Sequence, residues 1–96
     1  MIIWVLYDIE KDKSRTKVSK LCEQAGLYRV QYSCFLGTLT ANEKDTLRLQ
    51  IEALIDEEKD KVYIFSMSKD ELRNTDLLGQ AFDKDLVTDQ VRALFF

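Results

Sequence analysis

Asp8 ends an apolar run at residues 2–7 and is followed closely by two more acids, Glu10 and Asp12. An acid at the end of a buried strand is held by a rigid scaffold at the mouth of a loop, where many folds present functional groups. The chain contains no histidine, so phosphoryl-transfer chemistry would need a metal ion held by carboxylates. Mg²⁺ suits such a site because it keeps several waters, and a twofold dimer would bring two copies of Asp8 together. The alternative is that Asp8 or Asp12 only caps the following helix.

Basic and polar residues follow these acids. Arg15 and Lys17 fall at the start of the expected helix, where backbone N–H groups favour phosphate, and Arg29 follows its end. Ser33 could donate to a phosphate or to a metal-bound water, and Phe35 could stack on a base. The alternatives are solvated surface cations, a turn residue at Ser33, and a core or interface position for Phe35.

Hydrophobic periodicity predicts the elements that would position these side chains. A glycine, Gly26, ends the first predicted helix, and a capping box of Thr40 and Glu43 opens the second. The predicted order is strand, helix, two strands, helix and strand, at residues 2–8, 13–25, 28–31, 34–39, 40–57 and 61–67. This is the split βαβ order of the ferredoxin-like α+β fold, with both helices on one face of an antiparallel sheet.

We expect a single domain with a core at residues 1–67 and a C-terminal strand and tail at residues 68–96. Leu77-Leu78-Gly79 could form a short edge strand. The apolar end Leu94-Phe95-Phe96 is expected to pack on its own sheet or on that of a neighbouring copy. We favour the neighbour, since the sheet face opposite the helices still needs covering, and Trp4 would fit a dimer interface if it lies on that face.

The charge is unevenly distributed along the chain. The net charge is −3, but residues 1–42 carry +2 and residues 43–96 carry −5, which allows one basic face on an acidic protein. Cys22 and Cys34 lack a CxxC neighbour and are predicted to be buried reduced thiols, so the usual zinc sites are excluded. No apolar run has the length of a membrane span. The start lacks the basic region of a signal peptide, and we expect a cytoplasmic protein.

Several ordered blocks of the sequence resemble one known family. The family is the small CRISPR-associated adaptation protein, the smaller of the two proteins shared by most spacer-acquisition systems. Its pattern is an apolar strand ending in Tyr-Asp, a basic helix start and a G-L-x-R-V-Q-x-S-x-F segment. The matching blocks cover nearly the whole chain, at residues 7–9, 12–18, 26–35, 55–56, 60–65 and 94–96.

The resemblance implies a ferredoxin-like homodimer in which Asp8 from both subunits binds Mg²⁺ or Mn²⁺. It implies metal-dependent endonuclease (phosphodiesterase) activity on single-stranded RNA or double-stranded DNA, depending on the member. It also implies a role in antiviral defence, in which the dimer bridges two dimers of the larger CRISPR integrase and lies along the captured DNA. In that role the nuclease activity is dispensable.

Family roles transfer to matching positions of this chain. The resemblance implies a part in activity for Arg15, Arg29 and Phe35. It implies nucleic-acid contact for Arg15, Lys17, Arg29 and Ser33. Two departures stand out. A pI of about 4.9 is low for a protein that lies along DNA, so DNA binding could depend on the integrase. A related ribonuclease toxin shares the fold and the strand-end acid.

Three classes of function therefore stand beside one another. The first is a dimeric, metal-dependent endonuclease, and the second is a scaffold that holds DNA and the integrase without catalysis. The third is a small-molecule regulatory or metal-chaperone domain, although the chaperone version lacks its expected CxxC motif.

Overall fold

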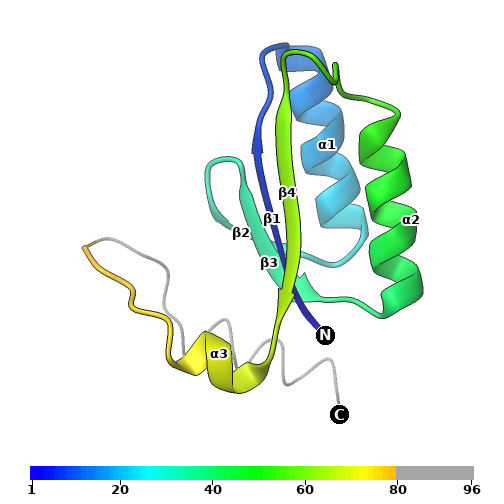
Figure 1. The fold of residues 1–96 in the computed structure, drawn as a ribbon. Coiled ribbons are helices and arrows are strands. Elements are labelled where there is room, and N and C mark those ends of the chain that lie inside the picture. The colour runs from blue at the N-terminus through cyan, green and yellow to red at the C-terminus, as the bar shows by residue number, and fades with distance from the viewer. Residues whose placement is uncertain (80–96) are drawn as a thin grey trace.

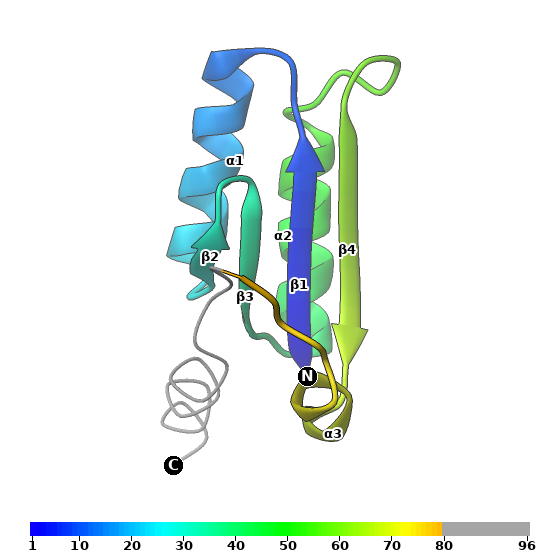
Figure 2. The same ribbon diagram turned by 90° about the vertical axis from the view of Figure 1, so that its left-hand side faces the viewer.

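The structure is a computed structural model that describes residues 1–79 of the 96-residue chain. Its elements are β1 (Ile2–Asp8), α1 (Asp12–Gln24), β2 (Tyr28–Gln31), β3 (Cys34–Thr38), α2 (Ala41–Glu52), β4 (Lys61–Met67) and α3 (Lys69–Arg73). The strands form one antiparallel sheet in the order β2-β3-β1-β4. Helices α1 and α2 cover one face of the sheet (Figure 1), and Figure 2 shows the other face in front. The predicted α+β class and βαββαβ order are confirmed.

Strand β1 lies in the middle of the sheet and is apolar on both faces, as predicted. Ile3, Val5 and Tyr7 face the helices and belong to the larger buried cluster. Ile2 and Trp4 face the other way and belong to a second, smaller cluster. Because successive strand residues point to opposite faces, Asp8, the predicted metal ligand that follows Tyr7, lies on the face without α1 and α2.

The end of α1 follows the prediction. Gly26 has a positive φ of 92°, a conformation that a residue without a Cβ adopts freely. Its N–H donates to the Glu23 carbonyl at 3.0 Å, and the Leu27 N–H donates to the Cys22 carbonyl at 3.1 Å. This pair of bonds is the Schellman motif, which turns the chain directly into β2.

The start of α1 differs from the prediction. Lys11 occupies the N-cap position and makes no side-chain cap hydrogen bond. Asp12 is the first helical residue, and Asp8 still belongs to β1. The interpretation of Asp8 or Asp12 as the cap was therefore wrong. Asp12 instead forms an ion pair with Arg15 one turn later.

Helix α2 begins as predicted but ends earlier. The Glu43 N–H donates to Thr40 Oγ1 at 3.1 Å and the Thr40 N–H donates to Glu43 Oε1 at 3.0 Å, which confirms the capping box. The helix ends at Glu52, not near residue 57. Asp56 accepts the Glu58 N–H at 3.0 Å, and such a local side-chain bond favours a turn over continued helix.

The chain after β4 forms a helix that the sequence analysis missed. Helix α3 opens with a capping box, because the Glu71 N–H donates to Ser68 Oγ at 3.1 Å and the Ser68 N–H to Glu71 Oε1 at 2.9 Å. Leu72 is buried and joins the second cluster beside Trp4. Residues 77–79 are not in a strand, so the predicted edge strand there was wrong. The rest of the predicted C-terminal strand and tail lies outside the described residues.

None of the helices that the structure describes is long and apolar enough to cross a membrane.

Candidate metal and nucleic-acid site

Four segments meet at the end of the sheet that carries the β1 tip: that tip, the start of α1, the β2–β3 turn and the α2–β4 loop (Figure 2). The Tyr7 N–H donates to the Ser33 carbonyl at 3.1 Å and joins the turn to β1. The Glu10 N–H donates to Asp60 Oδ1 at 3.0 Å and joins the two loops. These hydrogen bonds fix the backbone on both sides of Asp8, the predicted metal ligand.

Asp8 is exposed at the tip of β1, opposite Lys61 of β4. Within residues 1–79, no three or more histidine, cysteine, aspartate or glutamate side chains gather to hold a metal ion. The described part of one chain therefore offers Asp8 without a cluster of three ligands around it. This donor suits Mg²⁺ or Mn²⁺, hard ions that take oxygen ligands, and Mg²⁺ binds through one or two carboxylates while keeping several waters. The predicted metal site would therefore take one Asp8 carboxylate from each of two chains.

A polar pocket of about 230 Å³ lies on the helix side of the same end. Helix α1, strand β2 and the β2–β3 turn supply most of its walls. Its lining residues are Tyr7, Arg15, Thr16, Ser19, Arg29, Tyr32 and Ser33. The pocket thus brings together three predicted nucleic-acid contacts, the two arginines and the turn serine, next to the strand that carries the predicted metal ligand. Two cations in one small pocket favour an anion such as phosphate.

Arg15 is held over the pocket by three contacts. Its Nη1 donates to the Ile9 carbonyl at 3.1 Å, its guanidinium forms the ion pair with Asp12, and its Cζ lies 6.0 Å from the centre of the Tyr32 ring. The hydrogen bond to Ile9 attaches Arg15 to the segment directly after Asp8. The guanidinium has five N–H donors, so a phosphate oxygen can share it with these partners.

Arg29 is positioned from the opposite wall of the pocket. Its Nη2 donates a short hydrogen bond to Ser19 Oγ, and its Cζ lies 5.3 Å from the centre of the Phe35 ring. Phe35 is fully buried and stacks on Tyr7 with ring centres 6.3 Å apart. The core interpretation of Phe35 is confirmed, and a buried ring is not accessible to a base.

Tyr7 adds a buried hydroxyl beneath the arginines. Burial raises the pKa of Tyr7, and hydrogen bonding with Ser19 opposes that change. A raised pKa keeps the phenol neutral and able to donate a hydrogen bond at physiological pH.

Lys17 does not line the pocket and lies exposed on α1. It can contact an extended nucleic-acid backbone but not a group inside the pocket.

The predicted state of both cysteines is confirmed, since Cys22 and Cys34 are buried free thiols. Burial raises the pKa of Cys22 to about 12 and also raises the pKa of Cys34. Neutral buried thiols are poor nucleophiles and metal ligands, so neither belongs to the site.

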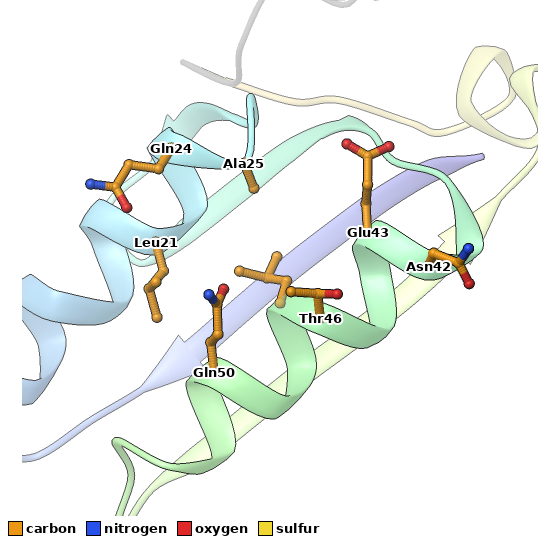
Figure 3. Close-up of a pocket in the computed structure, with 8 residues that line it drawn as sticks. Leu21, Gln24, Ala25, Asn42, Glu43, Thr46 and Gln50 are labelled. Atoms are coloured by element: carbon orange, nitrogen blue, oxygen red, sulfur yellow. The ribbon is translucent and has the colours of Figure 1, made fainter.

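The groove between α1 and α2 has a different character (Figure 3). It measures about 350 Å³ and is lined by apolar, amide, hydroxyl and carboxylate side chains. Leu21 of α1 and Gln50 of α2 lie opposite each other across it. None of the described residues that line it is a lysine or an arginine. The groove therefore lacks the positive charge that a phosphate site needs.

A family model described as "CRISPR associated protein Cas2" matches residues 1–75. The chain belongs to the Cas2 family. Curated Cas2 relatives include "CRISPR-associated endoribonuclease Cas2 1" of Archaeoglobus fulgidus, 39% identical over 67 residues that cover 70% of this chain and 71% of the relative. Another is "CRISPR-associated endonuclease Cas2" of Halalkalibacterium halodurans, 30% identical over 91 residues that cover 90% and 94%.

Solved Cas2 structures share the fold. The crystal structure of Streptococcus pyogenes Cas2 at pH 6.5 has a TM-score of 0.71 and 30% identity, and the match covers 82% of this chain and 100% of that one. These findings confirm the family that the sequence blocks indicated.

Sequence reasoning gave no role to three residues of this candidate site. Ser19 lies one helical turn after Arg15, so the i, i+4 spacing places both on one face of α1 and could have indicated it. Tyr32 was assigned to the turn without a role. Asp60 carried no signal, because its partner Glu10 is 50 residues away.

Proposed function

We propose that this Cas2-family chain is a metal-dependent endonuclease that acts as a homodimer. The observation that carries the proposal is the exposed Asp8 at the tip of β1, beside a pocket that holds Arg15 and Arg29. The names of the curated relatives, endoribonuclease and endonuclease, support cleavage of nucleic acid. The substrate class is a phosphodiester of RNA or DNA.

Each residue of the site has a separate role in this proposal. Asp8 would hold Mg²⁺ or Mn²⁺ together with Asp8 of a second copy. The bound ion would act as a Lewis acid and lower the pKa of a water bound to it. Arg15 and Arg29 bind the phosphate oxygens and stabilise negative charge that develops there. Ser33 and the neutral Tyr7 hydroxyl donate hydrogen bonds at the wall of the pocket. Lys17 binds the nucleic-acid backbone outside it.

The face of the sheet opposite the helices supports the dimer. Tyr63 and Phe65 of β4 are 61% and 41% exposed, and they pair with Leu6 and Trp4 of β1 across that face. Phe65 also stacks on Trp4 with ring centres 6.1 Å apart. Exposed aromatic residues on one face mark interaction surfaces. A second copy on this face would cover the aromatic rings and bring two Asp8 carboxylates closer.

A cleavage assay tests the nuclease. Purified protein is incubated with single-stranded RNA and with double-stranded DNA, in Mg²⁺ or Mn²⁺ and in EDTA. We expect metal-dependent cleavage that is lost in Asp8→Ala and kept in Leu49→Ala, an exposed change on α2. The proposal fails if the protein cuts neither substrate, or if Asp8→Ala cuts as well as the wild type.

In the cell, we place this dimer in the cytoplasm as a CRISPR spacer-acquisition protein, where it bridges the larger integrase and contacts DNA. A scaffold without nuclease activity is the second candidate, favoured by the exposed aromatic face. The family match favours both candidates over the related ribonuclease toxin. A spacer-acquisition assay with Asp8→Ala separates them, because retained acquisition indicates the scaffold. Deletion of residues 88–96 should abolish integrase capture if the C-terminal tail contributes to that interface.

A further inference from the structure

Tyr32 presents an accessible aromatic ring at the mouth of the arginine pocket. The residue is 69% exposed, whereas Phe35 is fully buried and Tyr7 is 7% exposed. An aromatic contact to a base at this site therefore falls to Tyr32 and not to Phe35. The proposed nuclease function gives the pocket its ligand class, and the inference below rests on it.

The hairpin turn holds Tyr32 outward. Gln31 pairs with Cys34, which leaves Tyr32 and Ser33 as the two turn residues, and the register shifts between Arg29 and Gln31. Ser33 has a positive φ of 61°, and its carbonyl accepts the Tyr7 N–H of β1. The turn is thus tied to the central strand of the sheet. A ring that is already positioned loses little conformational entropy when it binds a ligand.

The surroundings of the ring match a nucleotide. The Arg15 guanidinium lies 6.0 Å from the centre of the Tyr32 ring, and both residues line the pocket that contains Arg29. An apolar, polarisable ring surface therefore lies next to two positive charges. A base offers a flat ring that can stack on Tyr32, and its adjoining phosphate offers the negative charge that the arginines attract.

We propose that Tyr32 stacks on an unpaired nucleobase whose adjoining phosphate lies between Arg15 and Arg29. The ligand is one nucleotide of a single strand, either RNA or DNA, because a base inside a duplex has both faces covered by its neighbours. In this role Tyr32 touches the substrate through its ring and is a substrate-binding residue. Stacking tolerates any base, so the site reads single-strandedness and not sequence.

Binding of matched single-stranded oligonucleotides, with and without bases, tests the inference. Fluorescence anisotropy measures the full-length protein against single strands of RNA and DNA, and against abasic strands with the same number of phosphates. We expect Tyr32→Ala to weaken binding of base-containing strands about tenfold and to leave binding of abasic strands unchanged. Tyr32→Phe keeps the ring and should restore binding. Leu49→Ala is the matched surface control, since it also removes an exposed apolar side chain.

Two outcomes overturn the inference: an unchanged affinity of Tyr32→Ala for base-containing strands, or an equal loss for base-containing and abasic strands. Circular dichroism of each variant confirms that it is folded. The proposed nuclease is tested separately, because it fails if the Asp8→Asn variant cuts normally. Tyr32-dependent binding without any cleavage would support the stacking site and reject the nuclease.

Discussion

Arg15 lines the pocket and also forms an ion pair within its own helix. Asp12 is 89% exposed and forms an ion pair with Arg15 from the preceding turn. An exposed pair of this kind adds little to stability, because water screens both charges. We expect the Asp12–Arg15 pair to affect phosphate binding more than stability. The Asp12 carboxylate competes directly with a phosphate for the Arg15 guanidinium.

Asp12→Asn should therefore strengthen binding of single-stranded oligonucleotides about twofold to threefold at low salt. The added net positive charge at the pocket should also make the affinity more dependent on salt. Fluorescence anisotropy across a salt series measures both effects. The control is Asp70→Asn, which removes another i, i+3 ion pair, with Arg73 of α3. Equal gains in the two variants would show a general charge effect and contradict a specific role for Asp12.

Individual residues also show what sequence could reveal about the site. Asp8, Arg15 and Arg29 were predictable because strand ends and helix starts can be located from periodicity. The hydroxyl of Ser19 beneath Arg29, and the burial of Phe35 beneath the same side chain, depend on packing between α1 and β2. Such contacts have no signature in the local pattern.

At the scale of elements, the two capping boxes make α2 and α3 sensitive to acid. The hydrogen bond from the Thr40 backbone N–H lowers the pKa of Glu43 below its ordinary value of 4.5. A group whose pKa is lowered by folding contributes stability that is present above its unfolded pKa and is lost as the pH falls through its folded pKa. The Glu43 contribution is therefore complete at neutral pH and is lost below about pH 4.5.

Glu43→Gln tests this dependence, because glutamine can replace glutamate in a capping box but does not titrate. We expect the variant to be less stable than the wild type at pH 7 and equally stable at low pH. Urea unfolding from pH 7 to pH 3 measures the difference. Glu57→Gln, an exposed acid outside both boxes, should show no such trend. A stability difference that stays constant down to pH 3 would contradict the account.

The two loops beside Asp8 are joined by another carboxylate. Asp60 accepts the Asp56 N–H at 2.8 Å with Oδ2 and the Glu10 N–H at 3.0 Å with Oδ1. These bonds, first from Asp56 and then from Glu10, lower the pKa of Asp60. The carboxylate thus holds the β1–α1 loop against the α2–β4 loop.

Asp60→Ala should release both loops, since two backbone donors lose their charged acceptor. We expect hydrogen exchange at the Glu10 and Asp56 amides to become roughly tenfold faster, while exchange in the middle of β1 stays unchanged. Glu58→Ala is the neighbouring control. Unchanged protection at Glu10 would remove the case for Asp60 as the link between the loops.

The elements differ in how well sequence predicts them. The four strands were located within one residue, because each has a clear run of apolar or β-branched residues bounded by turn or cap signals. The end of α2 was placed too late, because Leu54 and Ile55 continue the apolar stripe and pack on the core after the helix has ended. Helix α3 was missed because only a short capping box, Ser68 to Glu71, marks it.

At the scale of the whole molecule, the sheet has one face covered by helices and one that is partly covered, where Tyr63 and Phe65 stay exposed while Trp4 packs with Leu72. Helices α1 and α2 cover one face of the sheet (Figure 1). The other face carries Trp4, Tyr63 and Phe65, and the tip of β1 points Asp8 to the same side. The dimer stays a prediction, drawn from Asp8, Trp4 and the family resemblance, because a single chain does not show which surface a second copy covers.

Tyr63→Glu should disrupt the proposed dimer, since it places a charge among the exposed aromatic residues of that face. We expect the variant to be a folded monomer by light scattering at concentrations where the wild type is a dimer. Leu49→Glu is the matched control, because Leu49 is similarly exposed, at 57%, but lies on the helix side. A wild-type monomer, or a Tyr63→Glu dimer, would place the interface elsewhere.

In the proposed function, Asp8 provides half of a metal site that two chains complete. Calorimetric titration with Mn²⁺ tests it most directly, because the stoichiometry counts the chains that share one ion. We expect one ion for every two wild-type chains, and no binding at this site in Asp8→Asn, an isosteric change at an exposed position. One ion per chain, or equal affinity in Asp8→Asn, would contradict it.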